Sequence, residues 1–361
     1  IMLRTSLVII VILFAYLCFW PVPIEPVSWD APKNNGFVGD FAPNSRLSNI
    51  EFIELTDTHG PEGLAVLNGE VYAATREGWI LRYNETSGEI TKLVNTNGSP
   101  LGLAFDAKDN LLIADAYNGV LSLSPQGDLT VLTNRLDGLP IEYADDLDVT
   151  DDGRIYFSDA TTKFGARRNG GTYAASLLDA SEHGSYGRLL VYDPADRSTK
   201  LVMDGLDFAN GVATAADSSF VLVNETSAYR INKYWLKGEK AGRSEIIIDN
   251  LPGFPDNIVR GRDGRFWVGL VSPRNEALDF FSNWPLIRAM NLRLPKSMQL
   301  AAESYSHVFA MDENGNIIIS LQDPNGIYHT NTGAMETDDW LYISSLHADN
   351  LARIRKHDIG L

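Results

Sequence analysis

Short apolar stretches alternate with turns rich in Gly, Asn and Asp from about residue 49 to the end of the chain. Within each stretch apolar and polar residues alternate, which is the pattern of a half-buried β-strand. Turn residues recur about every 8–12 residues, as they do in antiparallel sheets. The pattern therefore predicts an all-β body.

The strand pattern is itself repeated along this body. Each copy contains strands separated by turns, and the copies begin near residues 63, 102, 146, 210, 256 and 307. A repeat of about 40 residues with four strands is typical of one blade of a propeller. We therefore predict a six-bladed β-propeller over residues 49–361, in which a strand at residues 51–55 joins the last blade and closes the ring.

Two insertions interrupt the repeat, at about residues 162–186 and 274–304. The second insertion is apolar and aromatic at roughly helical spacing over residues 280–295. One interpretation is a helix packed on a face of the propeller. The other is a lid or an element that contacts a membrane, because exposed apolar residues often mark such surfaces.

The N-terminal segment differs from the body. Residues 7–20 are 14 uncharged, mostly apolar residues, and Arg4 precedes them. A basic residue before the run and acidic residues after it favour an inside-to-outside orientation. We predict that residues 1–24 form a signal anchor or, alternatively, a cleaved signal peptide. Residues 25–48 are rich in Pro, Asn, Gly and Ser and are predicted to be a linker. The body is therefore expected outside the cytoplasm, on a single-pass membrane protein or, after cleavage, in a secreted or periplasmic one.

Composition limits the chemistry. Asp and Glu number 47 against 30 Lys and Arg, and this net charge of −17 argues against nucleic-acid binding. Cys18 is the only cysteine, so the chain has no internal disulfide and no cysteine-based zinc site. Oxygen atoms or the six histidines would have to bind any metal. Three asparagines begin the acceptor pattern for N-glycosylation: Asn84, Asn97 and Asn224.

Oxygen-bearing side chains recur where the first strand of a blade begins. These residues are Glu62, Asp145, Asp146, Asn210, Asp256 and Asn257. The first strands of a propeller surround its central channel, so we expect these side chains to converge there. Each of them separately could simply form a turn. Carboxylate and amide oxygens are the ligands that a hard cation prefers. In addition, several carboxylates facing one channel would repel each other unless a cation lay between them. We therefore predict a site for Ca²⁺ or another divalent cation.

Several motifs resemble those of one family. They are GPEGLA at residues 60–65, the NG of FANGVA at residues 210–211, LPGFPDNI at residues 251–258 followed by RFWVGL at residues 265–270, RINKYWLKG at residues 230–238 and the pair DLDV and IYFSDA at residues 146–160. The chain resembles the strictosidine synthase-like proteins over about residues 49–355. These belong to the calcium-dependent six-bladed propellers, with the paraoxonases and gluconolactonases. The N-terminal anchor resembles that of the adipocyte plasma membrane-associated branch, whose members are described as arylesterase-like.

The resemblance implies roles for single residues. Those that match the family's metal ligands are Glu62, Asn210 and Asp256, with Asn257 as a further ligand. Asp145 stands where most of the family has Asn, and the change adds a negative charge to the site. Asp146 matches a residue that holds a second, structural calcium in paraoxonases.

Two departures from the family pattern affect the expected chemistry. Leu101 occupies the position of a paraoxonase histidine, so a histidine relay is not expected there. Residues 329–335 contain no acid, whereas strictosidine synthases use a glutamate in the last blade. His59 and His347, together with Leu101, are predicted to lie near the channel mouth, where they could contact substrate.

These features predict a calcium-dependent hydrolase of small esters or lactones. The cation would polarise the carbonyl, and Asp256 would act as base or nucleophile, supported by Glu62. The first alternative is a non-catalytic binding module that keeps calcium for stability, because propellers serve many functions. The second is an enzyme of the synthase type that forms a carbon–nitrogen bond.

Overall fold

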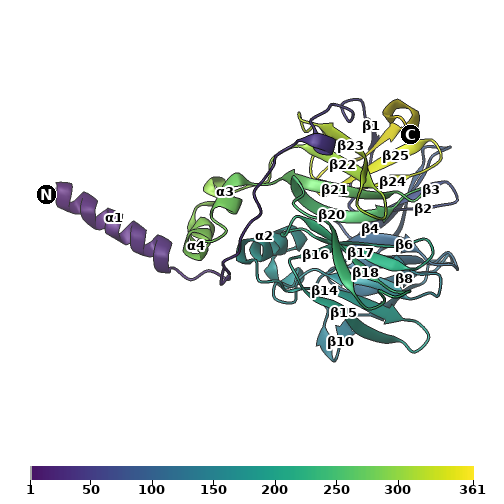
Figure 1. Cartoon of the computed structure of the whole chain (residues 1–361), viewed down its shortest axis with the longest axis horizontal. Helices are drawn as coiled ribbons and strands as arrows, with labels where there is room; N and C mark the ends of the chain where they lie inside the picture. Colours follow the sequence, from purple (N-terminus) through teal and green to yellow (C-terminus); the bar gives the residue numbers. More distant parts are fainter. Residues whose placement is uncertain (1) are drawn as a thin grey trace.

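Six four-stranded antiparallel sheets surround a central channel in the computed structural model, which describes residues 2–361 and their side chains from residue 5 onward (Figure 1). The predicted six-bladed propeller is confirmed, but the sixth blade begins at Asn331 and not near residue 307. Residues 306–323 form the two outer strands of the fifth blade, which the insertion at 274–304 splits, so that its period is not visible in the sequence. Each of the first three blades runs outward from its inner strand, with the following bounds: β2 (Leu64–Leu67), β3 (Glu70–Ala74), β4 (Trp79–Asn84) and β5 (Ile90–Asn95); β6 (Pro100–Phe105), β7 (Leu111–Asp115), β8 (Gly119–Leu123) and β9 (Leu129–Thr133); β12 (Ala144–Val149), β13 (Ile155–Asp159), β14 (Gly187–Asp193) and β15 (Ser198–Leu206). A short hairpin of β10 (Arg135–Leu136) and β11 (Leu139–Pro140) lies between the second and third blades.

The last blade closes the ring with a strand from the other end of the chain. Blades four to six are formed by β16 (Ala209–Thr214), β17 (Phe220–Glu225), β18 (Arg230–Trp235) and β19 (Ser244–Ile248); β20 (Gly253–Arg260), β21 (Phe266–Pro273), β22 (Ser306–Met311) and β23 (Ile317–Asp323); β24 (Asn331–Glu336), β25 (Trp340–Ser345), β26 (Asn350–Arg355) and β1 (Glu51–Glu54). Glu51 of β1 pairs antiparallel with Arg353 of β26. The prediction that the early strand completes the final blade is therefore confirmed.

The hydrophobic core lies between neighbouring blades. One cluster, for example, joins Phe220 and Leu222 of the fourth blade to Phe266, Val268 and Phe309 of the fifth. The inner strands β12 and β16 are buried on both sides, whereas an outer strand such as β5 is partly exposed along its length. Burial of apolar side chains between sheets is the dominant favourable contribution to such a fold, and it holds the inner strands in fixed positions around the channel.

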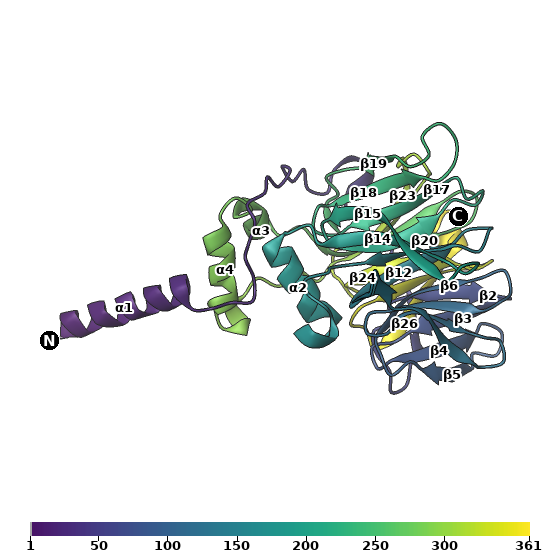
Figure 2. The same ribbon diagram turned by 90° about the horizontal axis from the view of Figure 1, so that it is seen from below.

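Both predicted insertions contain helices, and they lie on the same face of the propeller (Figure 1, Figure 2). The first holds η2 (Arg167–Asn169) and α2 (Thr172–Glu182). The second holds α3 (Glu276–Phe280), α4 (Pro285–Arg293) and η3 (Lys296–Met298). Helix α4 packs against α2 and against α1. Short 3₁₀ turns complete the chain at η1 (Gly39–Phe41) and η4 (Lys356–Ile359).

Helix α1 (Met2–Phe19) extends away from the propeller on the side of these helices (Figure 2). Arg293 of α4 donates from Nη1 to the carbonyl oxygen of Leu17 at 2.8 Å, and Tyr16 donates to the carbonyl oxygen of Arg293 at 3.2 Å. Among the described residues, no helix meets the length and apolarity required to cross a membrane. Residue 1 of the predicted 1–24 segment lies outside the described residues.

Residues 22–33, which we call the strap, comprise the end of the predicted 1–24 segment and the start of the predicted linker, and they pack against both helical insertions. The Val27 N–H donates to the carbonyl oxygen of Glu182 at the end of α2, at 2.8 Å, and Arg288 of α4 donates to the Val27 carbonyl oxygen. Trp29 stacks on His183, with ring centroids 3.8 Å apart. The strap therefore ties α2 to α4 on the helical face.

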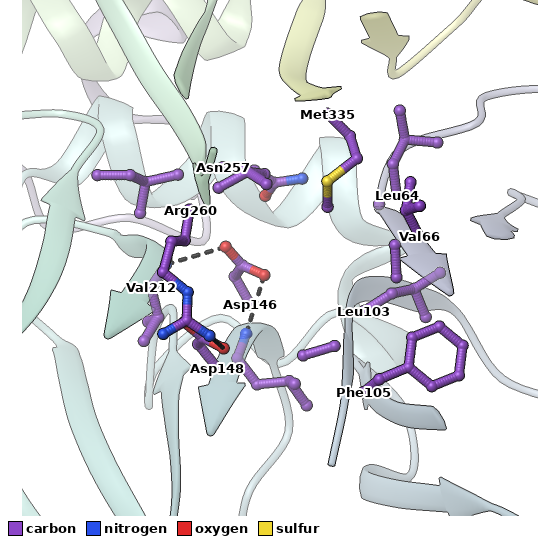
Figure 3. A pocket seen from close by; sticks show the side chains of 16 residues that line it. Leu64, Val66, Leu103, Phe105, Asp146, Asp148, Val212, Asn257, Arg260 and Met335 are labelled. Atoms are coloured by element: carbon purple, nitrogen blue, oxygen red, sulfur yellow. Dashed lines mark hydrogen bonds and ion pairs between the residues drawn. The ribbon is translucent and has the colours of Figure 1, made fainter. Parts of the chain in front are cut away.

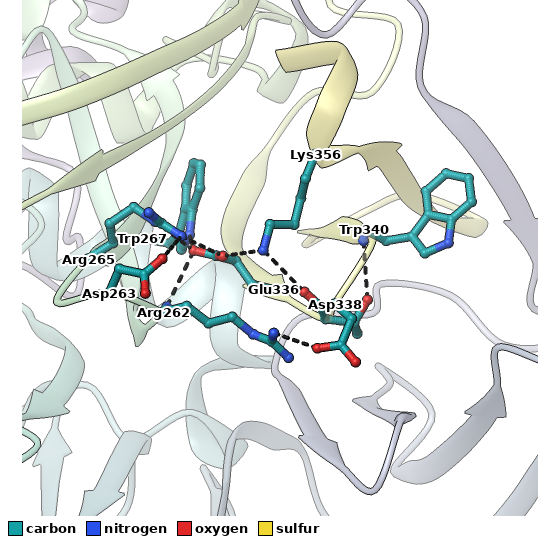
Figure 4. Close-up of polar contacts among 9 residues, drawn as sticks. Arg262, Asp263, Arg265, Trp267, Glu336, Asp338, Trp340 and Lys356 are labelled. Carbon is teal, nitrogen blue, oxygen red and sulfur yellow. Dashed lines mark hydrogen bonds and ion pairs between the residues drawn. The ribbon is translucent and has the colours of Figure 1, made fainter. Parts of the chain in front are cut away.

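A cluster of polar side chains joins the fifth and sixth blades (Figure 4). Glu336, at the end of β24, accepts hydrogen bonds from Trp267 Nε1 at 2.7 Å and from Arg265 Nε at 3.0 Å. Its other oxygen lies 3.0 Å from Lys356 Nζ and 3.0 Å from Arg265 Nη2. We call these four side chains the blade clasp. A charge buried between blades requires such partners to offset its desolvation.

Candidate functional site

Four of the six oxygen-bearing side chains predicted at the blade starts converge at one end of the channel, whereas Asp146 and Asn257 line a cavity further along it. Glu62, Asp145, Asn210 and Asp256 come from four blades, are all buried, and line one cavity of about 70 Å³, the site cavity. The cavity opens on the face that carries α2, because Thr172, Tyr173 and Ser176 also line it. The predicted convergence is therefore present in the structure.

Bulges in the inner strands turn these side chains into the channel. The pairing of β12 with β13 shifts between Ala144 and Leu147, where Asp145 and Asp146 lie. The same shift recurs in β16 around Asn210, and in β20 around the pair Asp256 and Asn257. A bulge leaves extra residues unpaired and changes the direction of their side chains. The repeated position of the bulge explains why residues at one phase of the blades meet.

Glycines beside the site residues allow neighbouring inner strands to come close. A Cβ on Gly63, the residue after Glu62, would lie 1.7 Å from the carbonyl oxygen of Leu101 in the next blade. A Cβ on Gly211, the residue after Asn210, would lie 2.3 Å from the Ile258 nitrogen. The Glu-Gly and Asn-Gly pairs of the sequence thus combine a polar side chain for the channel with the close contact that the channel wall needs.

Burial and mutual repulsion strongly perturb the carboxyl groups. Burial raises the pKa of Glu62 well above its usual range, and the charges of Asp256 and Asp146 raise it further. Burial also raises the pKa of Asp256 to about 7, although a hydrogen bond from the Asn210 side chain opposes the rise. The pKa of Asp145 is raised well above its usual range by burial and by Glu62 and Asp256. Groups perturbed in this way are typical of functional sites.

Three buried oxygens of the site have no hydrogen-bond donor among the described residues: Asn210 Oδ1, Asp256 Oδ1 and Asn257 Oδ1. A buried acceptor without a partner is costly, and a hard cation would satisfy several such oxygens together. Over residues 5–361 no group of three or more His, Cys, Asp or Glu side chains is placed to hold a metal. The oxygens that fit a cation here come from amides as well as from carboxylates.

Asp146, predicted to hold a second cation, has both of its oxygens bound to main-chain nitrogens. Oδ1 accepts from Leu147 and Oδ2 from Val212, both at 2.9 Å. Burial raises its pKa to about 8, although these bonds lower it. Asp148 accepts from the Thr214 N–H at 2.8 Å in the same way. Asp146 and Asp148 therefore connect the third blade to the fourth, and these hydrogen bonds stabilise the ring.

The side chains of Asp146 and Asn257 line a second cavity of about 240 Å³ further along the channel (Figure 3). Asp148 and Arg260 lie at this end, with Arg260 Nη2 3.9 Å from Asp148 Oδ1. Asn257 links the two parts of the channel, since its Nδ2 donates to the Glu62 carbonyl oxygen at 3.2 Å. The channel thus has an acidic end below α2 and a mixed polar and apolar end opposite.

The other three predicted site residues lie outside the lining of the site cavity. His59 is half exposed and hydrogen-bonded from Nδ1 to Glu77 at 2.7 Å. Leu101 is buried in an apolar cluster with Tyr143 and Phe208. His347 contacts the edge of the Tyr173 ring, at a centroid distance of 5.0 Å. Their contact with a substrate stays a prediction.

Asn224 is a site residue whose role the sequence did not indicate. It is fully buried, and its Nδ2 donates to the carbonyl oxygen of Asp256 at 2.5 Å. Thr226 donates to the Pro255 carbonyl oxygen at 2.7 Å. The acceptor pattern Asn224-Glu-Thr226 therefore positions the bulge that carries Asp256. Because Asn224 has no exposed surface, the folded protein cannot carry a glycan there, and only Asn84 and Asn97 retain that prediction.

Comparison with known proteins agrees with this architecture. The family model described as "Strictosidine synthase" matches residues 145–239, and "Strictosidine synthase-like, N-terminal" matches residues 39–83. The chain is 37% identical to strictosidine synthase-like protein 13 of Arabidopsis thaliana over 318 residues, covering 78% of this chain and 77% of that one. It is 30% identical to the adipocyte plasma membrane-associated protein of Homo sapiens over 378 residues, covering 98% and 88%.

Solved structures share the fold at lower identity. A gluconolactonase from Xanthomonas campestris matches with a TM-score of 0.62 at 17% identity, covering 92% of this chain and 98% of that one. A calcium-binding regucalcin from Agrobacterium tumefaciens matches with a TM-score of 0.58 at 15% identity, covering 84% and 93%. These likenesses establish the shared propeller, and the sequence relatives establish the family: the chain belongs to the strictosidine synthase-like family.

Proposed function

We propose that this protein is a calcium-dependent hydrolase of small esters or lactones, with its reaction centre in the site cavity. The observation that carries the proposal is the pair of buried, donor-free oxygens of Asn210 and Asp256, which line one cavity with Glu62, together with the donor-free Oδ1 of Asn257, whose Nδ2 donates to the Glu62 carbonyl oxygen. Those oxygens and Asp145 would hold the cation. When bound, calcium supplies charge that polarises a carbonyl oxygen.

Asp256 is the residue best placed to move a proton. Its main chain is held by Asn224, and its Oδ1, which faces no donor among the described residues, would bind the cation, so that its second carboxylate oxygen would serve as the base. Asp256 would take a proton from the attacking water, while Tyr143 and Phe208 exclude other solvent from the buried side of the cavity. Glu62, which lines the same cavity, would support Asp256 in this role.

The test is hydrolysis of phenyl acetate and of a δ-lactone by the full chain, with calcium and with a chelator. We expect turnover that requires calcium and that falls at least 100-fold in folded Asp256→Asn when both proteins are assayed at a calcium concentration that saturates each of them. Asp349→Asn is the control, since that carboxylate is 82% exposed. Turnover that survives both the chelator and Asp256→Asn would contradict the proposal.

The second candidate is a non-catalytic binding module. It is favoured by Asp146 and Asp148, because these channel carboxylates bond to main-chain nitrogens of the next blade and so contribute to structure. Folded, calcium-loaded protein that hydrolyses none of the substrates but melts at a lower temperature after chelation would support it. The sixth blade presents Thr330 and no acid to the site cavity, which argues against a synthase reaction based on a glutamate there.

We also propose that α1 attaches the protein to a membrane. The side chains from Leu7 to Phe14 are exposed, and one relative is named for its association with the plasma membrane. The full chain should float with phosphatidylcholine vesicles, and a chain without residues 1–20 should not. Protease protection in sealed vesicles would then test the predicted position of the body outside the cytoplasm.

A further inference from the structure

The insertion that carries α3 and α4 has four large apolar side chains that are more than half exposed. We call them the insertion patch, and they are Phe280 (73% exposed), Trp284 (59%), Leu286 (53%) and Met298 (64%). Each blade, in contrast, exposes a single large apolar side chain on its outer strand. Single exposed apolar residues are ordinary, whereas several gathered in one short segment mark an interaction surface.

Two arginines of α4 hold the insertion in place. Arg288 is buried and donates from Nη1 to the carbonyl oxygen of Ser181 in α2, at 3.1 Å. Arg293 donates from Nε to the carbonyl oxygen of Trp20, directly after α1, at 2.6 Å. Helix α4 is thus fixed to α2 on one side and to the end of α1 on the other. The exposure of the insertion patch is therefore a property of the folded insertion.

The charges around the insertion patch differ from those of the chain as a whole. Residues 280–300 contain three basic residues and no acidic one, although the net charge of the chain is −17. Residues 1–24 likewise contain Arg4 and no acidic residue. Trp20, which lies where α1 meets α4, is 60% exposed. Tryptophan and exposed apolar side chains beside cations fit a lipid interface, because acyl chains cover the apolar groups and phosphates attract the cations.

The position of α1 decides which surface can reach the insertion patch. Helix α1 leads away from the body, and α3 and α4 lie between its end and the propeller (Figure 2). We infer that the insertion patch lies in the headgroup layer of the membrane that α1 enters and forms a second contact between the body and that membrane. This inference rests on the proposed attachment through α1 and is independent of the proposed hydrolysis. It turns the face on which the site cavity opens toward the bilayer.

The experiment requires the full chain. Four side chains bind a bilayer weakly by themselves, but attachment through α1 raises their effective concentration at the membrane. A nitrobenzoxadiazole label is placed on one engineered cysteine in a Cys18→Ser background, and the protein is added to phosphatidylcholine vesicles. Phe280→Cys carries the label in the insertion patch. Ala107→Cys is the matched control, because Ala107 is exposed in the turn at the far end of the inner strand β6.

Bromine on the lipid acyl chains, near the headgroups, quenches a label that touches the membrane. We expect emission from position 280 to fall at least twofold in brominated vesicles and emission from position 107 to stay unchanged. Equal quenching at both positions, or no quenching at position 280, in a chain that floats with the vesicles would overturn this inference alone. A chain that does not float would overturn the attachment through α1 and this inference together.

A second set of variants tests whether the side chains of the insertion patch make the contact. With the label on Met298→Cys, the double change Phe280→Asp and Trp284→Asp should abolish quenching and leave flotation intact, because α1 is unchanged. Val131→Asp is the control, since Val131 is 56% exposed on the outer strand β9, and it should alter neither quantity. Quenching that survives in the folded double variant would overturn the role of the patch. A shift in emission without quenching would indicate a second copy of the chain in place of lipid, and it would also overturn the inference.

Discussion

The blade clasp provides a sharp test of what holds the ring together. Glu336→Gln keeps the size of the side chain and removes its charge, which leaves Arg265 and Lys356 without their common partner. The Glu336 side chain is 1% exposed, and those of Arg265 and Lys356 are 13% and 12% exposed. Removing one member of a fully buried pair costs about 3–5 kcal/mol. The clasp should cost less than that, because the side chains of Arg265 and Lys356 are partly exposed.

The pKa of Glu336 gives a second measure of the same effect. Burial raises the pKa, but hydrogen bonds from Arg265, Trp267 and Lys356 lower it from 4.5 to about 2. That fall corresponds to roughly 3 kcal/mol. Since the cationic ends of the clasp reach solvent, we expect about 2 kcal/mol. A lowered pKa means that this stability is present above pH 4.5 and is lost as the pH falls toward 2.

Urea unfolding of wild type and Glu336→Gln between pH 3 and pH 7 measures both quantities. The difference in unfolding free energy should be about 2 kcal/mol at pH 7 and should shrink by about half between pH 5 and pH 3. Asp338→Asn is the control: its ion pair with Arg262 spans 2.5 Å, but Asp338 is 87% exposed, so it should cost below about 0.5 kcal/mol. A difference that does not change with pH would refute the role given to the charge of Glu336.

Three further predictions concern the site and the strap. Asn224→Ala should weaken calcium binding by about 10–100-fold, because it releases the main chain of Asp256, whereas Asn84→Ala should leave calcium affinity unchanged. Calorimetric titration with calcium measures the affinity of both variants. Equal affinities would contradict the positioning role of Asn224. Calcium binding at pH 6 should release protons, because the pKa of Asp256 is raised to about 7 and the carboxyl must ionise to bind; binding heats that do not vary between buffers of different ionisation heat would count against it. Trp29→Ala should lower the free energy of unfolding by about 2 kcal/mol and speed proteolysis within residues 22–33, because Trp29 stacks on His183. Trp284→Ala, at a side chain that is 59% exposed, should change neither quantity. Unchanged proteolysis of Trp29→Ala would show that the stack does not hold the strap in place.

The repeat of strands and turns was sufficient to predict the propeller, the number of its blades and its closure, but not the start of the sixth blade, because the insertion at 274–304 interrupts the fifth. That information is local, because period-2 alternation and turn residues are visible in single segments. The convergence of Glu62, Asp145, Asn210 and Asp256 also followed, since residues at one phase of a radial repeat share one end of the channel. Their role with a cation stays a prediction that the calcium experiments test.

Features that depend on contacts distant in sequence could not be predicted. The bulges around Asp145, Asn210 and Asp256 are a property of two paired strands, and nothing in one strand specifies the shift. Asn224 looks like an ordinary residue at a strand end, because its partner, the Asp256 carbonyl, lies 32 residues away. The strap has the composition of a linker, and its order comes from Arg288 and Glu182 on separate insertions.

The pairing of β1 with β26 makes the ring the last structure that the chain can complete during synthesis. Glu51 must wait until Arg353 has been made before it finds its partner. For a flexible chain, bringing together two segments separated by about 300 residues costs roughly 5 kcal/mol of chain entropy. The contacts between β1 and β26 offset this cost only once the ring has closed. The final blade should therefore form slowly and open first. A circular permutant that joins residues 50 and 356 and begins at the exposed Asn97, between the first two blades, would make every blade continuous and should remove this slow step.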